Sequence, residues 1–178
     1  MMPTMAHPDL PSVAGGDGVL GDLHREHYRA LVRLAGLLLH DQGASEEVVQ
    51  DAFVQLHLRW RRLRDPEKAP AWLRSTVLNG ARSRLRHLEV RRRHEPDAGA
   101  GAGYESAEDA ALARDSSDRL LAALRTLPAR QREAVVLRFY LDLSEAEMAA
   151  AMGVSAGSVK THLHRGLAAL QTRIEGRP

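Results

Sequence analysis

The fold of this chain is decided by residues 143–163, which read LSEAEMAAAMGVSAGSVKTHL. Ser144, followed three residues later by Glu147, forms a capping box that predicts the start of a short helix. Gly153 is expected to end this helix in a left-handed conformation, and Ser155 can cap a second helix. A short helix, a glycine turn and a second helix are typical of a helix-turn-helix, whose second helix enters the major groove of DNA.

The two helices are predicted to be apolar on one side only. The stripe of the first is Met148, Ala149 and Met152. The core-facing residues of the second are Val159, Leu163, Leu167 and Leu170. Its outer face then consists of Ser158, Lys160, Thr161, His164 and Arg165. A polar, basic outer face is what contact with base edges and phosphates requires.

The residues before this motif are also predicted to be helical, so that residues 118–175 form one domain. An amphipathic helix is indicated by Leu120, Leu121, Leu124 and Leu127. Pro128 begins the next helix, which continues to a turn at Asp142 and contains Ala134, Val135, Leu137, Arg138 and Tyr140.

A first helical domain is predicted over residues 22–93. Its first helix carries Leu23, His27, Leu31, Leu34 and Leu38, and a break follows at residues 40–43. Ser45 is expected to cap a second helix, whose stripe is Val49, Ala52, Phe53, Leu56, Trp60 and Leu63. After a polar loop at residues 64–70, a third helix carries Trp72, Leu73, Val77, Ala81, Leu85 and Leu88.

The segments outside these blocks are expected to be flexible. Residues 1–21 form a tail rich in Pro, Gly and Asp, and residues 94–117 form an acidic linker with little to bury. The glycines of the linker do not form a nucleotide-binding loop, because no strand precedes them and no Lys-Ser/Thr follows. The predicted fold class is therefore all-α, with two small helical domains joined by a flexible linker.

The net charge of +2 conceals a strong segregation of charge along the chain. Arginines dominate residues 59–93, where only Asp65, Glu67 and Glu89 oppose them, and acidic residues dominate the linker. A basic block suits a phosphate backbone, although a solvated helix face has the same composition.

Several classes of function are disfavoured by composition. The chain has no cysteine, no apolar stretch long enough to cross a membrane and no signal peptide at its amino terminus, which predicts a cytoplasmic protein. The nine histidines lack zinc-site spacing, and no serine lies in a nucleophile elbow. We expect no catalytic residue, no metal site and no cofactor, and therefore no enzyme.

Three ordered segments resemble the extracytoplasmic-function (ECF) sigma factors of bacterial RNA polymerase, which belong to the sigma-70 family. The first runs from Leu23 to Tyr28 and continues at residues 45–53. The second is Ala71-Trp72-Leu73-Arg74 with Asn79 and the arginines that follow. The third extends from Leu127-Pro128 to Arg165. The resemblance covers the chain from about Leu23 to Glu175 and implies sigma region 2 at residues 22–93 and sigma region 4 at residues 118–175.

The resemblance implies roles for residues in the first domain. Docking on the clamp helices of the polymerase β′ subunit falls to Glu47, Gln50, Asp51 and Gln55. Recognition and melting of the minus-ten promoter element fall to Arg64, Lys68, Trp72, Asn79, Arg82, Arg86 and Arg91. Trp72 is ambiguous, because a tryptophan on an apolar stripe also fits the core.

In the second domain the resemblance implies that the minus-thirty-five element is read as duplex DNA by Ser158, Lys160, Thr161, His164 and Arg165. His162 stands where the family commonly has a basic residue, and Gly166 where it commonly has alanine. The implied partners are core RNA polymerase (β′ clamp helices and β flap), promoter DNA and an anti-sigma factor, with no insertion in a membrane. The acidic linker would approach the RNA exit channel.

Two other hypotheses remain open from the sequence. A helix-turn-helix transcriptional regulator would bind duplex operator DNA by itself, with the first domain serving dimerisation or sensing. An adaptor or sigma-like decoy would dock on polymerase without supporting transcription, and Glu47→Arg combined with Asp51→Arg would abolish its docking.

Overall fold

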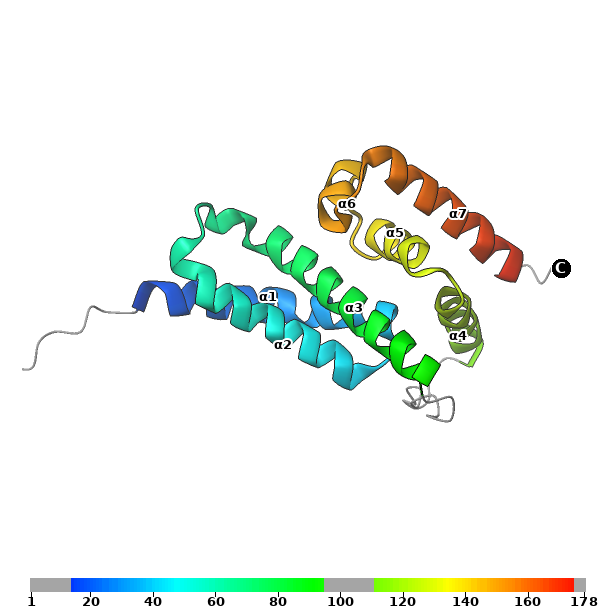
Figure 1. Ribbon diagram of the computed structural model, residues 1–178, viewed down its shortest axis with the longest axis horizontal. Helices are drawn as coiled ribbons and strands as arrows, with labels where there is room; N and C mark the ends of the chain where they lie inside the picture. The colour runs from blue at the N-terminus through cyan, green and yellow to red at the C-terminus, as the bar shows by residue number, and fades with distance from the viewer. Residues whose placement is uncertain (1–13, 95–110, 175–178) are drawn as a thin grey trace, which may run out of the picture.

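The computed structural model describes the backbone of residues 14–94 and 111–174, and the side chains of residues 18–90 and 118–174. Every regular element in these ranges is helical, which confirms the predicted fold class. The amino-terminal bundle consists of α1 to α3, and the carboxy-terminal bundle of α4 to α7 (Figure 1).

The amino-terminal bundle begins with α1 (Ala14–Leu39), followed directly by α2 (Gln42–Arg59). His40 adopts a left-handed conformation between them, with φ 57°. The side chain of Asp41 caps α2 by accepting a hydrogen bond from Ala44 N at 2.9 Å. The expectation that Ser45 caps this helix is wrong, because Ser45 lies fully buried inside α2 and donates its hydroxyl to Asp41 O.

The connection from α2 to α3 contains two short 3-10 helices, η1 (Trp60–Arg62) and η2 (Pro66–Lys68), and α3 spans Ala69–His94. Each proline of this loop opens a helical turn: Pro66 begins η2, and Pro70 lies in the first turn of α3. The three long helices share one core, whose fully buried large side chains include Leu34, Val49, Leu56, Leu73, Val77 and Leu78.

The carboxy-terminal bundle contains α4 (Ala111–Arg125), α5 (Ala129–Phe139), α6 (Glu145–Met152) and α7 (Ala156–Ile174). Its buried side chains include Leu124, Leu127, Val136, Leu137, Met148, Met152, Val159 and Leu170. The helix-turn-helix of α6 and α7 therefore packs on α4 and α5, and contacts from both of these helices hold α7 in place.

One core position of α7 differs from the sequence prediction. Leu167 was expected to face the core, but 39% of it is exposed, and Gly166 is buried instead. A methyl group on Gly166 would lie 2.8 Å from Val135 Cγ2 and 3.1 Å from the backbone oxygen of Gln131. The missing side chain thus lets α7 approach α5 closely at Gly166, and Leu167 beside it lies on the exposed side of the helix.

The helices extend beyond the predicted domain boundaries. The flexible tail was expected to reach residue 21, but α1 begins at Ala14. The linker was expected at residues 94–117, but α3 continues to His94 and α4 begins at Ala111. Once a helix is nucleated by packed residues, each added turn forms at little cost, which explains these extensions. The rest of the expected tail and linker lies outside the described residues.

The two bundles pack against each other, which no sequence pattern indicated. α3 contacts α6, and α1 contacts both α4 and α5 (Figure 1). The guanidinium of Arg132 on α5 donates to the backbone oxygen of Leu38 at 3.0 Å and lies 2.6 Å from His40 Nε2. A cavity of about 480 Å³ remains between α1, α2 and the carboxy-terminal bundle, and Tyr140 and Arg125 lie on its wall.

Candidate nucleic-acid interface

Two helix caps and a glycine fix both ends of α6 and the start of α7. Ser144 and Glu147 form the predicted capping box, in which Glu147 N donates to Ser144 Oγ at 3.3 Å and Ser144 N donates to Glu147 Oε2 at 2.9 Å. Gly153 ends α6 with φ 65°. Ser155 then accepts from Ser158 N at 3.2 Å, which confirms the predicted cap of α7.

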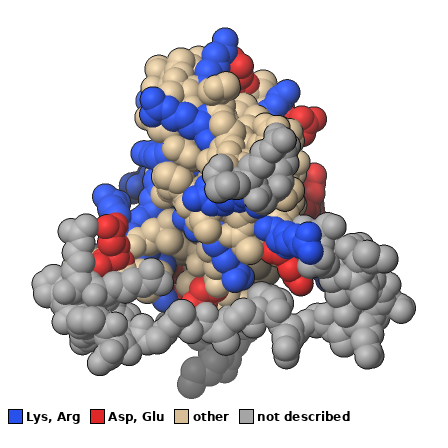
Figure 2. Space-filling model, turned by 90° about the vertical axis from the view of Figure 1, so that its right-hand side faces the viewer, with Lys and Arg blue, Asp and Glu red and all other residues tan. Residues whose placement is uncertain are grey.

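Four of the five residues expected on the outer face of α7 are exposed, namely Lys160, Thr161, His164 and Arg165, whereas Ser158 is half-buried beside Ser155. Lys160 Nζ lies 3.4 Å from a carboxylate oxygen of Glu145, and Thr161 donates to Gly157 O at 3.0 Å. Figure 2 views the end of the molecule formed by the carboxy-terminal bundle and shows Lys and Arg side chains spread over it, with acidic side chains near its margins. The exposed face suits a polyanion.

The predicted minus-ten residues occupy different environments in the amino-terminal bundle. Arg64, Lys68 and Arg86 are exposed, and Lys68 forms an ion pair of 2.9 Å with Asp65, which raises the pKa of the lysine. Trp72 is half-buried: part of its ring packs against the core, and the rest is accessible to solvent. The side chain of Arg91 lies outside the described part of the chain.

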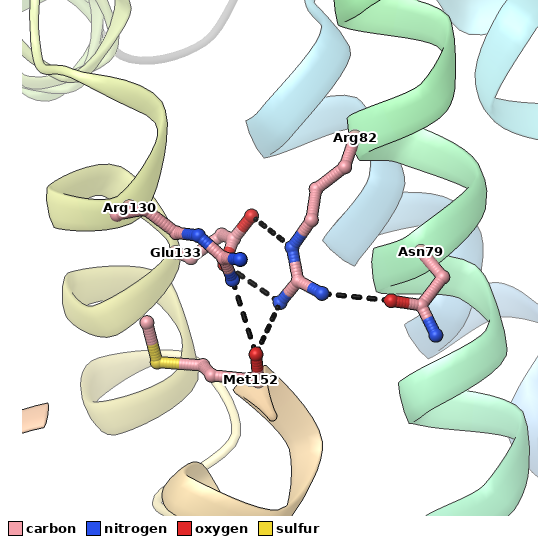
Figure 3. Close-up of polar contacts among 5 residues, drawn as sticks. All are labelled: Asn79, Arg82, Arg130, Glu133 and Met152. Atoms are coloured by element: carbon pink, nitrogen blue, oxygen red, sulfur yellow. Dashed lines mark hydrogen bonds and ion pairs between the residues drawn. The ribbon is translucent and has the colours of Figure 1, made fainter. Parts of the chain in front are cut away.

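Two further minus-ten residues, Asn79 and Arg82, lie one turn apart on α3 and contact each other. Arg82 Nη1 donates to Asn79 Oδ1 at 2.7 Å. The rest of the guanidinium is turned toward the carboxy-terminal bundle, where Nε and Nη2 donate to the two carboxylate oxygens of Glu133 at 2.7 and 2.9 Å (Figure 3). In this structure Arg82 is therefore not free to bind a phosphate.

The four predicted docking residues of α2, namely Glu47, Gln50, Asp51 and Gln55, are all exposed, and Glu47 forms an ion pair of 3.1 Å with Arg84 of α3. Sequence analysis missed two apolar neighbours on the exposed side of this helix, Val54 and Leu58, which are 57% and 74% exposed. Because they follow Asp51 at helical spacing and fall outside the buried stripe, this pattern could have revealed them. Carboxylates around exposed apolar side chains are suited to a protein partner.

A polar groove of about 520 Å³ lies between α2, which carries the predicted docking residues, and α3. Its walls include Asp51 and Gln55 from α2, and Trp72, Asn79 and His87 from α3. The close packing of the two helices beneath it depends on Gly80, where a methyl group would lie 2.7 Å from Val48 Cγ1. The groove places two of the predicted docking residues, Asp51 and Gln55, next to the aromatic ring of Trp72 and the amide of Asn79, groups that are suited to contact an unpaired base.

Within residues 14–94 and 111–174, no cluster of three or more His, Asp or Glu side chains is arranged to hold a metal ion. None of the helices described is at once long and apolar enough to span a bilayer.

Comparison with protein families assigns both bundles. The model of sigma-70 region 2 matches residues 23–91, and the model of sigma-70 region 4 matches residues 117–170. These ranges coincide with the amino-terminal bundle and with most of the carboxy-terminal bundle.

Curated relatives match over most of their length. The chain is 37% identical to the RNA polymerase sigma-E factor of Streptomyces avermitilis over 156 residues, which cover 86% of this chain and 83% of the relative. It is 32% identical to the ECF RNA polymerase sigma factor SigM of Mycobacterium tuberculosis over 158 residues, covering 89% and 78% of the two chains.

Two solved structures share the fold. CnrH, solved in complex with the cytosolic domain of CnrY, has a TM-score of 0.68 at 25% identity, covering 93% of each chain. The sigma factor RpoE of Bartonella quintana, solved with the anti-sigma factor NepR, has a TM-score of 0.68 at 24% identity, covering 88% of this chain and 99% of RpoE.

Proposed function

The chain belongs to the ECF group of the sigma-70 family of RNA polymerase sigma factors. On that premise we propose that it binds core RNA polymerase, directs it to specific promoters and helps to melt the minus-ten element. The observation that carries the proposal is the presence of both sigma regions in one chain, in order, within a match to a sigma factor that covers 86% of the chain. In this role the chain performs no catalysis itself and acts in the cytoplasm, where polymerase meets the chromosome.

Recognition of the minus-thirty-five element is assigned to the exposed face of α7. Lys160 and Arg165 are positioned to contact phosphates or guanine, and Thr161 and His164 add hydrogen-bonding groups. The ion pair between Lys160 and Glu145 is exposed and therefore weak, so that a DNA phosphate can replace Glu145 as the partner of Lys160.

Melting of the minus-ten element is assigned to the basic side of the amino-terminal bundle. Arg64 and Arg86 are exposed and suited to hold the backbone of an unpaired strand. Trp72 and Asn79 border the same groove, so that an extruded base would meet an aromatic edge and an amide with both donor and acceptor atoms.

Docking on the β′ clamp helices is assigned to α2. We expect Asp51→Arg to reduce affinity for core polymerase at least tenfold, because a carboxylate that faces a basic partner becomes a like charge. Glu26→Arg is the matched control, since it makes the same charge change on an exposed carboxylate of α1. Surface plasmon resonance with purified core polymerase measures both, and equal affinities would contradict the assignment.

Run-off transcription tests the function as a whole. The purified chain is added to core polymerase on a library of genomic fragments, and the starts of the transcripts are sequenced. We expect transcripts that share two upstream motifs and that are lost with core polymerase alone. Binding to core without any transcript would instead identify a decoy, and sequence-specific duplex binding without core would identify a helix-turn-helix regulator.

An anti-sigma protein is the third partner that we propose. The support is a shared fold with a sigma factor that was solved together with an anti-sigma factor. Co-purification of the tagged chain from its native host tests this partner, and the captured protein should suppress the run-off transcripts when it is added back.

A further inference from the structure

The cavity between the two bundles has an apolar interior. Its volume of about 480 Å³ lies within the range of small-molecule sites in proteins. Val32 and Leu37 of α1 and Leu121 of α4 line it, and all three pack against the core but remain only half-buried. The packing of the bundles thus leaves apolar surface that a ligand of matching shape would remove from water.

Two arginines from different bundles also line this cavity. Arg33 of α1 and Arg125 of α4 are both exposed, as side chains at the mouth of a cavity are. Among the residues that the structure describes, none forms a hydrogen bond or an ion pair with either of these side chains. Each guanidinium therefore keeps its full set of N–H donors for an anion.

Positive charge dominates the surroundings of the cavity. Asp41 is the one carboxylate among the described residues that line it, and its Oδ1 accepts from Ala44 N at 2.9 Å as the cap of α2. Burial lowers the pKa of His40, on the same wall, to about 4, and the positive charges of Arg132 and Arg125 act in the same direction. The local field therefore favours an anion over a neutral or cationic ligand.

We propose that this cavity binds a small carboxylic acid with an apolar body, in its ionised form. The apolar body lies against Val32, Leu37 and Leu121. The carboxylate accepts hydrogen bonds from the guanidiniums of Arg33 and Arg125. Because these two arginines belong to different bundles, the complete site exists only while the bundles are packed, and a bound ligand stabilises their packing by mass action.

Octanoate is the probe, and 1-octanol is its neutral counterpart of the same chain length. Titration of the full-length chain at neutral pH, followed by two-dimensional ¹H–¹⁵N NMR, measures affinity and locates the site. We expect octanoate to bind with a Kd of about 1 mM or below and to shift the amides of residues 32–37 and 121–125. 1-Octanol should bind about tenfold more weakly, because its hydroxyl cannot replace a carboxylate between two guanidiniums.

This binding experiment contains no DNA and no polymerase. A failure to bind octanoate would therefore overturn the carboxylate site and leave the proposed function to be judged by run-off transcription.

Arg33→Gln tests the contact with the carboxylate. We expect the affinity for octanoate to fall by about tenfold and the affinity for 1-octanol to stay the same, because only the charged ligand loses a charge-assisted hydrogen bond. Arg29→Gln is the matched control, since it makes the same change of charge on an exposed arginine of α1 that lies outside the cavity. This control should bind octanoate as the unmodified chain does.

Gly36→Met tests whether the ligand lies inside the cavity. Gly36 lines the cavity, and an added methyl group would lie 4.0 Å from Ser45 Oγ, so that a side chain can begin there without a clash. Methionine is flexible enough to fill the space and should abolish the binding of both probes. Gly21→Met on the same helix, where an added methyl group meets nothing within 4 Å, is the control and should retain both affinities.

Equal affinities for octanoate and 1-octanol would overturn the proposal, because the cavity would then not select an anion. Amide shifts centred on the exposed side chains Val54 and Leu58 would also overturn it, since they would mark binding of an apolar chain to an unrelated surface. An equal loss of affinity in Arg33→Gln and Arg29→Gln would show that net charge alone attracts octanoate. Should circular dichroism show that Gly36→Met fails to fold, the arginine variants and the position of the amide shifts still decide.

Discussion

At the scale of single residues, Gly166 controls how closely α7 approaches α5. Helix propensity alone would favour alanine there by about 1 kcal/mol. The structure opposes this gain, because the added methyl group would meet Val135 and the backbone oxygen of Gln131 inside the normal contact distance. The position of α7 thus depends on a buried glycine that has no side chain.

We expect Gly166→Ala to lower the free energy of unfolding of the carboxy-terminal bundle by about 1 kcal/mol, since overpacking costs more than the propensity gain. Gly157→Ala is the control on the same helix, because its added methyl group meets Ser155 Oγ only at 3.9 Å. That variant should stabilise the bundle by about 0.5–1 kcal/mol. Urea titrations followed by circular dichroism measure both, and a stabilising effect of Gly166→Ala would refute the packing argument.

His40 connects the interface between the bundles to pH. Burial lowers its pKa to about 4, and the nearby charges of Arg132 and Arg125 act in the same direction. Arg33 and Asp41 border the same cavity. While the bundles are packed, the imidazole of His40 is therefore neutral, and we expect its pKa to return toward 6.5 when they separate.

Between about pH 6.5 and pH 4, His40 binds a proton when the bundles are separated but not when they are packed together. Acidification through this window should therefore weaken the packing of the two bundles. Energy transfer between fluorescent labels attached at Arg29→Cys on α1 and Ala168→Cys on α7, both exposed positions, should fall. In His40→Gly the fall across the same window should be much smaller. Identical pH profiles for the two proteins would exclude His40 as the group responsible.

At the scale of elements, α6 is an eight-residue helix that depends on its ends. Isolated helices of this length are unstable, so the capping box and the buried methionines supply its stability. The hydrogen bonds from the hydroxyl and backbone N–H of Ser144 lower the pKa of Glu147.

We expect Ser144→Ala to destabilise the carboxy-terminal bundle by about 1 kcal/mol, the usual loss for a helix cap. The pKa of Glu147 should move toward its ordinary value, because the hydroxyl donor is lost. Thr172→Ala, which removes a hydroxyl bonded to Ala168 O near the end of α7, should have little effect. Thermal melts and carbon-detected NMR titration measure these changes, and an unaltered Glu147 titration would contradict the capping box.

At the scale of the whole molecule, hydrogen bonds between the two bundles join two cores that separate family models match. Residues 23–91 and 117–170 each match their own family model, yet Arg82, Arg132 and Tyr140 take part in bonds that cross between them. Docking of one bundle on the other stabilises both, just as binding of a ligand would.

This coupling predicts the shape of thermal unfolding. Differential scanning calorimetry of the unmodified chain should give one broad transition, whereas Glu133→Gln should give two, with the first at a midpoint lower by about 5 °C or more. Asp142→Asn is the control, because it removes the charge of an exposed carboxylate in the same bundle, and it should retain the single transition. Two transitions in the unmodified chain would mean that the bundles unfold independently.

Much of the candidate site could be predicted from local sequence. Helix spacing placed Glu47, Asp51, Lys160 and Arg165 on exposed faces, and all four are exposed. Errors arose where two local signals competed. Asp41 and Ser45 are both residue types that cap helices. The structure shows that Asp41 caps α2 and that Ser45 lies buried one turn inside it.

By itself, then, the sequence determined the helices, the caps of α6 and α7, the helix-turn-helix and its basic outer face, because each depends on residues within one or two helical turns. The tertiary structure alone decided that Gly166 faces α5 and that Glu133 meets Arg82. Glu133 and Arg82 are 51 positions apart in the chain. No local period encodes such a pair, since the distance between them is set by how rigid helices from two cores pack.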